Sequence, residues 1–328
     1  MREREPEIAY VSALAPYLRQ FVAEKRALGF CYRSQVVALR AFDHFLAEHQ
    51  VPDPDLAKSV VEAWVRKRPH ESVHTQQDRL YLVRQFSLFL IRRGFSPCLP
   101  GTHLLPRDQS LHLPHIFTRE QIKQLLAAAE QLRPDVRSPR REIMFPLIFR
   151  LLYGCGLRVN EALRLRVKDI DLARGVLTIR EAKFCKDRLV PITPRLAGRL
   201  RSYATIQRRP RATSDFLFPA PDGGPFHQQT IHDVFRQLLR ACRIPYQGRG
   251  KGPRLHDLRH TFAVHRLMMW YRDEVNLGVA LPVLATYMGH ESLSGTQRYL
   301  RLTAEMYPDL VATLQARYGQ LIPQQERP

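Results

Sequence analysis

Residues 254–263 read RLHDLRHTFA, and this stretch places two imidazoles and a guanidinium on one face of a predicted helix. His256, Arg259 and His260 stand at positions i, i+3 and i+4, which share one side of an α-helix. A cation beside two imidazoles is a poor apolar core and a good pocket for a phosphate. A polar helix face exposed to solvent would show the same pattern. The spacing alone therefore does not decide between a solvent-exposed surface and an anion-binding site.

The charge of the whole chain favours an anionic partner. Its 328 residues, enough for two domains, carry 51 Lys and Arg against 31 Asp and Glu, a formal net charge of +20. An excess of this size is typical of proteins that bind a polyanion. The sequence has no run of about 18 apolar residues, no signal-peptide core and no basic amphipathic tail. Nucleic acid is therefore preferred to a membrane, and a cytoplasmic, nucleoid-associated bacterial protein is expected.

The sequence also argues against a bound cofactor. Its five cysteines are scattered and form no C-x-x-C pair, so a zinc site is not indicated. Neither G-x-x-x-x-G-K-[ST] nor G-x-G-x-x-G occurs, so nucleotide binding is not indicated. We therefore expect no cofactor and no metal.

Residues 1–95 are expected to form a compact module of four helices. Each is an amphipathic stretch bounded by a capping or helix-ending residue. A proline-rich stretch follows, FSPCLPGTHLLPRDQSLHLP, and predicts a linker over residues 96–115. The first stretch runs from about Val11 to Leu28, and the second from Ser34, as N-cap, to His49. The third begins after Asp55, and the fourth runs from after Ser72 to Arg93.

Residues 116–328 are predicted to form a second domain that is mainly α with a small antiparallel sheet. Most of the net charge belongs to this part of the chain, because residues 101–328 carry +16 of it. The expected elements are a helix behind the capping-box pattern of Thr118 and Gln121, helices over about residues 142–153 and from Val159, a β-hairpin with a charged tip at 175–192, and a short strand and turn at 216–226.

Four other polar residues of the second domain have positions that suit phosphate chemistry. Arg158 follows Gly156 and precedes a predicted helix, and helix N-termini favour anions. Lys183 lies at the charged tip of the hairpin, and Tyr299 follows nine residues after His290. Each has an ordinary alternative, because arginine is common at helix starts, charged turns are solvated and most tyrosines pack in a core.

Five short segments, in their order along the chain, resemble the motifs of the tyrosine recombinase (phage-integrase-like) family of DNA strand-exchange enzymes. These segments are CGLRVNEAL, AKFCKDRLVPI, LHDLRHTFA, YMGH and RYL. The resemblance covers residues 117–300, and the N-terminal module is similar to the family's four-helix (SAM-like) core-site-binding domain. The segment between Arg259 and His290 resembles that of integrase-like transposases of mobile elements. The resemblance implies the catalytic residues Arg158, Lys183, His256, Arg259 and His290 and the nucleophile Tyr299.

The resemblance implies a site-specific recombinase that cleaves and rejoins double-stranded DNA at core sites, for integration or transposition of a mobile element. Tyr299 would attack a phosphodiester and form a covalent 3′-phosphotyrosine, which keeps the bond energy, so rejoining needs neither ATP nor a metal. Forked donors on Arg158 and Arg259 suit the added negative charge on the phosphate oxygens. His256 could accept the tyrosine proton, and His290 would donate to a non-bridging oxygen.

Several roles stay open. The hairpin lysine would protonate the departing 5′ oxygen, and Lys183 and Lys186 both qualify, with Lys183 favoured by its spacing to the following Val-Pro. Glu161, at i+3 from Arg158, is expected to orient that arginine. His260 is expected to be a packing or hydrogen-bonding neighbour of the other two members of the opening trio.

The chain beyond Tyr299 has an apolar helical stripe and is expected to form a tail helix. In the family such a helix commonly docks on a neighbouring protomer, so a homo-tetramer with exchanged tails is expected, and packing on its own domain is the alternative. Two other functions remain open, a type IB topoisomerase-like enzyme that relaxes DNA and a catalytically silent DNA-binding protein. The stripe consists of Met306, Leu310, Val311 and Leu314.

Overall fold

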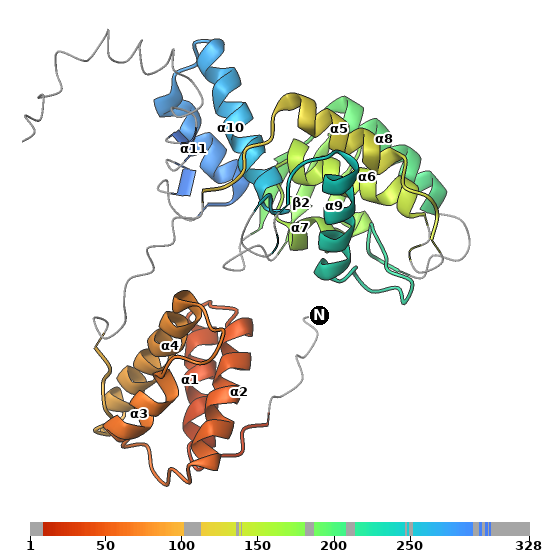
Figure 1. Ribbon diagram of the computed structural model, residues 1–328. Helices are drawn as coiled ribbons and strands as arrows, with labels where there is room; N and C mark the ends of the chain where they lie inside the picture. Colours follow the sequence, from red (N-terminus) through yellow and green to blue (C-terminus); the bar gives the residue numbers. More distant parts are fainter. Residues whose placement is uncertain are drawn as a thin grey trace, which may run out of the picture. The chain divides into compact units, whose positions relative to one another are not determined.

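A computed structural model describes residues 9–101, 113–135, 138, 140–180, 187–207, 214–246, 248, 252–290, 295, 296, 299, 300 and 302. The chain divides into two compact units, residues 1–112 and 113–328, each with its own hydrophobic core (Figure 1). None of the helices that the structure describes has the length and apolar character needed to span a membrane.

The first unit is a group of four helices around an aromatic core, as predicted. These helices are α1 (Ala15–Ala27), α2 (Arg33–Glu48), α3 (Lys58–Val65) and α4 (Val73–Arg92). The rings of Phe21 and Phe86 meet edge to face with their centroids 5.5 Å apart, and the ring of Phe42 lies 5.0 Å from that of Trp64. Large aromatic side chains give a small module the buried apolar area that its stability requires.

One helix start in this unit follows the predicted cap and another does not. Ser72 caps α4 as expected, because its hydroxyl accepts a hydrogen bond from the Thr75 N–H at 3.1 Å. The prediction of Ser34 as the N-cap of α2 is wrong, since the N-cap is Tyr32 in a left-handed conformation with φ of 53°. The Tyr32 ring packs edge-on against Phe21 at 5.7 Å, so a core contact overrides the local capping preference.

The second unit is built around a central helix, most of whose side chains are buried. Its helices are α5 (Arg119–Glu130), α6 (Arg141–Gly154), α7 (Val159–Leu163), α8 (Pro194–Gln207), α9 (Gln228–Ala241), α10 (Asp257–Arg272) and α11 (Leu277–Met288), with a 3₁₀ turn η2 at Val167–Asp169. The central helix is α6, and α5, α7, α8 and α10 pack against it. The predicted capping box opens α5, where the Thr118 hydroxyl accepts from the Gln121 N–H at 3.1 Å.

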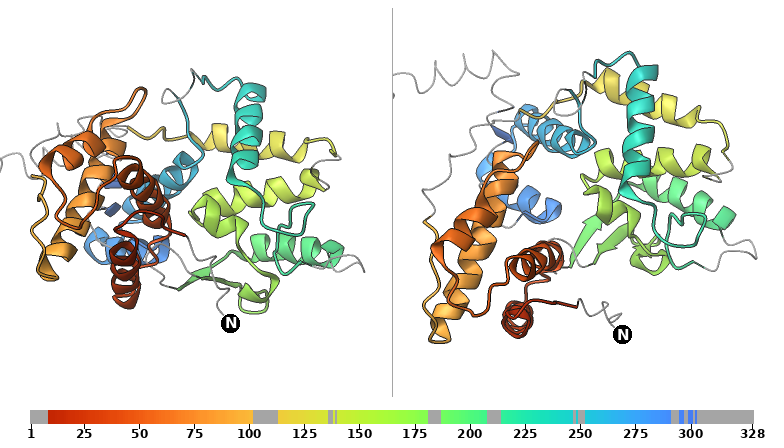
Figure 2. Two further views of the ribbon diagram at one scale, coloured as in Figure 1. Left: turned by 90° about the horizontal axis from the view of Figure 1, so that it is seen from below. Right: turned by 60° about the horizontal axis from the view of Figure 1, so that its bottom comes forward.

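A small antiparallel sheet lies among these helices (Figure 2). Its described strands are β1 (Ile170–Asp171), β2 (Val176–Ile179) and β3 (Arg188–Pro191), in the order β1-β2-β3. Strands β2 and β3 form the predicted hairpin, and their alternating residues Leu177, Ile179 and Val190 are buried on the core side. The hairpin tip at residues 181–186, which includes Lys183 and Lys186, lies outside the described residues.

The strand predicted at residues 216–226 is present only as isolated bridges. Arg166 pairs with Phe216, and Pro219 pairs with Pro225. Prolines have no backbone N–H, so a segment that contains three of them in seven residues cannot form a continuous ladder.

Two hydrogen bonds hold α10 against segments that come much earlier in the chain. The Thr261 hydroxyl accepts from the Phe117 N–H at 3.1 Å, and His265 Nδ1 is hydrogen-bonded to the Tyr153 hydroxyl at 3.0 Å. Because α10 begins at Asp257, with His256 as its N-cap, the trio of the opening motif occupies the first turn of this helix.

Candidate active site

Arg158 stands at the N-terminus of α7 and is held from two sides. Its Nη1 donates to Glu161 Oε1 at 2.7 Å, and its Nη2 donates to the carbonyl oxygen of Gly289 at 2.8 Å. The Arg158 backbone N–H donates to Glu161 Oε2 at 2.8 Å, so the carboxylate also caps the helix. The expected orienting contact between Glu161 and Arg158 is therefore present. The Arg158 side chain remains 23% exposed, which leaves it accessible to an anion.

Arg259 is buried and only 2% exposed. Its Nη1 donates to the carbonyl oxygen of Gly156, and its Nη2 donates to that of Met288 at 2.6 Å. Burial, followed by the positive charge of Arg158, lowers the pKa of Arg259 to about 10. The Arg259 guanidinium therefore still carries its positive charge at neutral pH, and the two carbonyl groups hold it in a buried position.

Arg188 is the third arginine of this cluster, and the sequence did not single it out as a site residue. It comes from β3, and its Nη1 and Nη2 donate to the two carboxylate oxygens of Glu161 at 2.9 and 2.8 Å. Its Nε donates to the carbonyl oxygen of Tyr287 at 2.9 Å. Such forked pairing is the strongest geometry between these two side-chain types.

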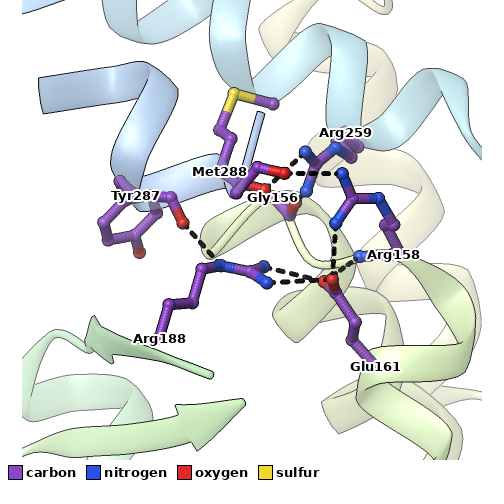
Figure 3. A network of polar contacts seen from close by, with 8 residues as sticks. Gly156, Arg158, Glu161, Arg188, Arg259, Tyr287 and Met288 are labelled. Atoms are coloured by element: carbon purple, nitrogen blue, oxygen red, sulfur yellow. Dashed lines mark hydrogen bonds and ion pairs between the residues drawn. The ribbon is translucent and has the colours of Figure 1, made fainter. Parts of the chain in front are cut away.

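The C-terminal end of α11 binds one arginine at each of three consecutive carbonyl groups (Figure 3). The last carbonyls of a helix have no partner within the helix, and the negative end of the helix dipole favours cations. The usual glycine cap is present, because the N–H groups of Gly289 and His290 donate to the carbonyls of Thr286 and Ala285. Three arginines from separate parts of the second unit bind the carbonyls that follow. The carbonyls of Tyr287, Met288 and Gly289 bind Arg188, Arg259 and Arg158, in that order.

The cluster has more positive than negative charge. Burial alone would raise the pKa of Glu161, but the hydrogen bonds and charge of Arg188, followed by those of Arg158, lower it to about 2. Glu161 is thus ionised at neutral pH and balances one of the three guanidinium groups. The remaining positive charge makes this a favourable site for a phosphate.

Two glycines allow the backbone to approach this cluster closely. Gly156 has a φ of +59°, and a Cβ at that position would lie 2.5 Å from Cδ1 of Phe262. Gly289 ends α11 with a φ of +68°, and a Cβ there would lie 3.0 Å from Nη1 of Arg188. Positive φ and close contact together explain why glycine stands at both positions.

The histidines and the tyrosine form the other side of the site. Tyr299 is 2% exposed, and its hydroxyl is hydrogen-bonded to Nδ1 of His260 at 2.9 Å. The His256 ring meets the His260 ring edge to face with centroids 4.7 Å apart. The His290 ring is stacked against that of Tyr299 at 6.0 Å, and its Nδ1 is hydrogen-bonded to the Thr296 hydroxyl at 2.7 Å.

Two of these histidines are neutral at pH 7. Removal from water, followed by the positive charges of Arg259 and Arg158, lowers the pKa of His290 to about 4. The same causes lower the pKa of His256 to about 4, although this residue keeps contact with solvent. A neutral imidazole offers one N–H donor and one acceptor nitrogen, so both rings can bond to a phosphate oxygen without adding charge.

The structure brings five of the six predicted site residues into one neighbourhood. Lys183, like its alternative Lys186, lies outside the described residues. Sequence reasoning missed the part played by Arg188 and the contact between His260 and Tyr299. The only sequence signal for His260 was its place on the same helical face as His256 and Arg259. The predicted residues that meet are Arg158, His256, Arg259, His290 and Tyr299.

Comparison with known proteins identifies the family of the chain. The model of the phage integrase family matches residues 115–306. A protein of Sinorhizobium fredii named as an integrase/recombinase, y4rB, is 31% identical over 312 residues, which cover 94% of this chain and 99% of that protein. A tyrosine recombinase of Pseudothermotoga lettingae is 28% identical over 279 residues, covering 84% of this chain and 88% of that one.

Solved structures share the fold. The Tn1549 transposon integrase in complex with transposon right end DNA has a TM-score of 0.61 and 15% identity, covering 93% of this chain and 99% of that chain. The site-specific recombinase XerH, in a post-cleavage complex with its difH substrate, has a TM-score of 0.59 and 16% identity, covering 86% and 78%. The family model spans more than half of the sequence, and a relative matches it almost end to end. The chain belongs to the phage integrase family and is a site-specific recombinase of the tyrosine type.

Proposed function

We propose that this recombinase cleaves and rejoins double-stranded DNA at specific core sites, with Tyr299 as the nucleophile, to integrate or transpose a mobile element. The observation that carries the proposal is the position of Tyr299. Its hydroxyl is bonded to an imidazole within a site that also holds three arginines and one ionised glutamate. This setting supports Tyr299 as the nucleophile, because the arginines provide positive charge for a phosphodiester close to the phenol.

Phosphate binding falls to the partly exposed Arg158 and to the neutral rings of His256 and His290. Arg259, buried below them, adds positive charge and fixes the loop at Gly156. The phosphate gains negative charge on its equatorial oxygens as the nucleophile attacks, so these donors bind the transition state more strongly than the ground state. Removing one such donor typically costs about 10²–10³ in rate, or about 3–4 kcal/mol.

The covalent step exchanges one phosphate ester for another. The bond from Tyr299 Oη to phosphorus forms, the bond from phosphorus to the 5′ oxygen breaks, and a DNA 3′-phosphate remains attached to the tyrosine. Lys183, or Lys186 in its place, supplies the proton that the departing 5′ oxygen needs. Rejoining is the reverse reaction with another 5′ hydroxyl, so no ATP is consumed.

We propose that the first unit contacts the core site and that four protomers assemble on two sites with exchanged C-terminal tails. Exposed basic residues at the end of α3, Arg66, Lys67 and Arg68, support DNA contact by this unit. The Arg68 guanidinium lies 4.6 Å from the centre of the Trp64 ring, which anchors this basic run to the core. The tail beyond residue 302 lies outside the described residues. The proposed location is the bacterial cytoplasm, on the nucleoid.

A trapping experiment tests the proposal. Protein incubated with fragmented DNA of the source genome is denatured, covalent complexes are recovered, and the DNA joined to Tyr299 is sequenced. The recovered junctions define a nicked substrate from which the short 5′ strand diffuses away, so that the adduct accumulates. We expect wild type to form the adduct and Tyr299→Phe to bind the same DNA without forming it. Binding by wild type without any adduct would support the catalytically silent alternative.

A second measurement separates the recombinase from a topoisomerase. A supercoiled plasmid that lacks the recovered site should stay supercoiled in the presence of the wild-type protein. Efficient relaxation of that plasmid would indicate an enzyme of the type IB class instead.

A further inference from the structure

His260 is the side chain whose imidazole meets the hydroxyl of Tyr299. The distance from Nδ1 to Oη is 2.9 Å, within the usual range of a hydrogen bond, and the two ring centroids lie 5.5 Å apart. His260 is partly buried in the first turn of α10, directly after the buried Arg259. Its backbone is therefore fixed by the same helix that holds the arginine in place.

His256, the other candidate for the tyrosine proton, stands one helical turn earlier. Its ring packs edge-on against His260, with a centroid distance of 4.7 Å, and it reaches solvent. This position suits a donor to a phosphate oxygen at the open side of the site. The nucleophile and its bonded imidazole lie on the enclosed side, since Tyr299 is 2% exposed.

We infer that His260 is a catalytic residue that accepts the proton of Tyr299 during DNA cleavage and returns it during rejoining. The inference rests on the proposed role of Tyr299 as nucleophile. In cleavage the Oη–H bond breaks, its proton moves to Nδ1, the Oη–phosphorus bond forms and the phosphorus–O5′ bond breaks. Nδ1 can accept only when the hydrogen of the ring is on Nε2, so the proposed transfer starts from the Nε2–H tautomer. In rejoining the imidazolium gives the proton back to the departing phenolate.

The need for such a base follows from the acidity of the phenol. A free tyrosine has a pKa of about 10, so at pH 7 only about one in a thousand is ionised. Positioned proton transfer by a side chain contributes about 10²–10⁴-fold to a rate. The His260 imidazole already occupies hydrogen-bonding distance, so the transfer requires no rearrangement of α10.

The test compares two substitutions of His260 on the nicked substrate. His260→Ala removes the ring, whereas His260→Asn keeps a polar atom near the position of Nδ1 but cannot take a proton near neutral pH. We expect both variants to cleave about 10²–10⁴-fold more slowly than wild type, with unchanged DNA affinity. Cleavage by His260→Asn at the wild-type rate would overturn the inference and leave His260 a positioning residue.

A more acidic nucleophile tests proton transfer directly. If His260 had only a structural role, the cleavage rate of its variants would not depend on the acidity of residue 299 in this way. Tyr299 is replaced by 3,5-difluorotyrosine, which is ionised to a much larger extent at neutral pH and needs a base less. We expect this replacement to restore most of the lost rate to His260→Asn and none to Arg158→Ala, whose defect lies in phosphate binding. Equal rescue of both variants, or rescue of neither, would contradict proton transfer to His260.

The chain supplies a matched control for the loss of a histidine–tyrosine hydrogen bond. His265 lies on the same helix, and its Nδ1 is bonded to the Tyr153 hydroxyl at 3.0 Å. His265→Asn should change the stability of α10 without creating a defect that difluorotyrosine relieves. Failure of the wild-type protein to form any adduct would contradict the proposed function itself, whereas failure confined to the His260 comparison contradicts only this inference.

Discussion

Glu161 and Arg188 lie 27 residues apart in the sequence and form a forked ion pair through both carboxylate oxygens, at 2.9 and 2.8 Å. The pair joins α7, which carries Arg158, to β3, which continues directly from the lysine-bearing hairpin tip. Both side chains are almost completely buried, at 6% and 9% exposure. The carboxylate therefore links the two predicted sources of catalytic cations, the N-terminus of α7 and the hairpin.

Replacing Arg188 by alanine should destabilise the second unit and slow DNA cleavage. Removing one partner of a buried ion pair leaves a desolvated charge and typically costs about 3–5 kcal/mol. Arg158 would also lose the fixed position of its own carboxylate partner. Urea denaturation and the nicked-substrate assay check the two effects. Arg174→Ala is the control, because Arg174 is 85% exposed and pairs with the half-exposed Asp171 on the surface, so this change should have little effect. Equal losses in both variants would rule out a special role for Arg188.

Glu161→Gln should remove part of the acid sensitivity of folding. The pKa of Glu161 is about 2 in the folded protein against an ordinary value of 4.5, so the folded state favours the ionised form. Its stabilising contribution, about 3 kcal/mol, is complete above pH 4.5 and is lost as the pH falls toward 2. Unfolding free energies of wild type and variant should differ most at neutral pH and converge only below about pH 2. A difference that is constant across this range would contradict the depressed pKa.

His256 and His290 should both titrate well below the usual pH of an imidazole. Their pKa values of about 4 mean that the unfolded chain binds more protons than the folded one between pH 4 and 6.5. Stability should therefore rise with pH through this window, and the rise should be smaller in His290→Asn. Proton–nitrogen correlation spectra of labelled histidines give the individual titration midpoints. A midpoint near 6.5 for His290 would contradict the effects of both burial and the neighbouring arginines on its pKa.

Gly156→Ala should destabilise the loop that supports Arg259. The added methyl group would lie 2.5 Å from the Phe262 ring, and overpacking of this kind typically costs about 1–3 kcal/mol beyond the strain of a positive φ. Gly223→Ala is the matched control, because Gly223 also has a positive φ, of +84°, but nothing lies within 4 Å of its Cβ position. Thermal unfolding of the two variants should separate the clash from the backbone strain. Similar losses of thermal stability in the two variants would mean that the Phe262 ring moves aside without a measurable loss of stability.

The lysine that protonates the 5′ oxygen can be identified by changing the leaving group. A substrate with sulfur in place of the bridging 5′ oxygen leaves readily without a proton. We expect Lys183→Ala to cleave this substrate nearly as well as wild type and to cleave ordinary DNA slowly. Lys186→Ala should show no such difference, and the opposite pattern would assign the role to Lys186.

The sequence predicted well the features that depend on neighbouring residues. The capping box at Thr118, the cap at Ser72 and the alternation in β2 and β3 are short-range preferences, and the structure has all three. The failures came where a distant contact competes with a local one. Tyr32 rather than Ser34 starts α2 because its ring packs on Phe21, and the order of residues cannot reveal that packing.

The sequence by itself therefore determined the helical class, the hairpin, the positive charge and the ordered set of residues that marks the family. Only the tertiary structure decided how those residues meet. The end of α11 binds arginines that lie 29, 99 and 131 residues away in the chain, and His260 meets Tyr299 across 39 residues. Helix periodicity relates positions within a few turns, whereas these contacts depend on how α7, α10, α11 and β3 pack. Packing thus made His260 the partner of the nucleophile, a role that its place on one helical face could not show.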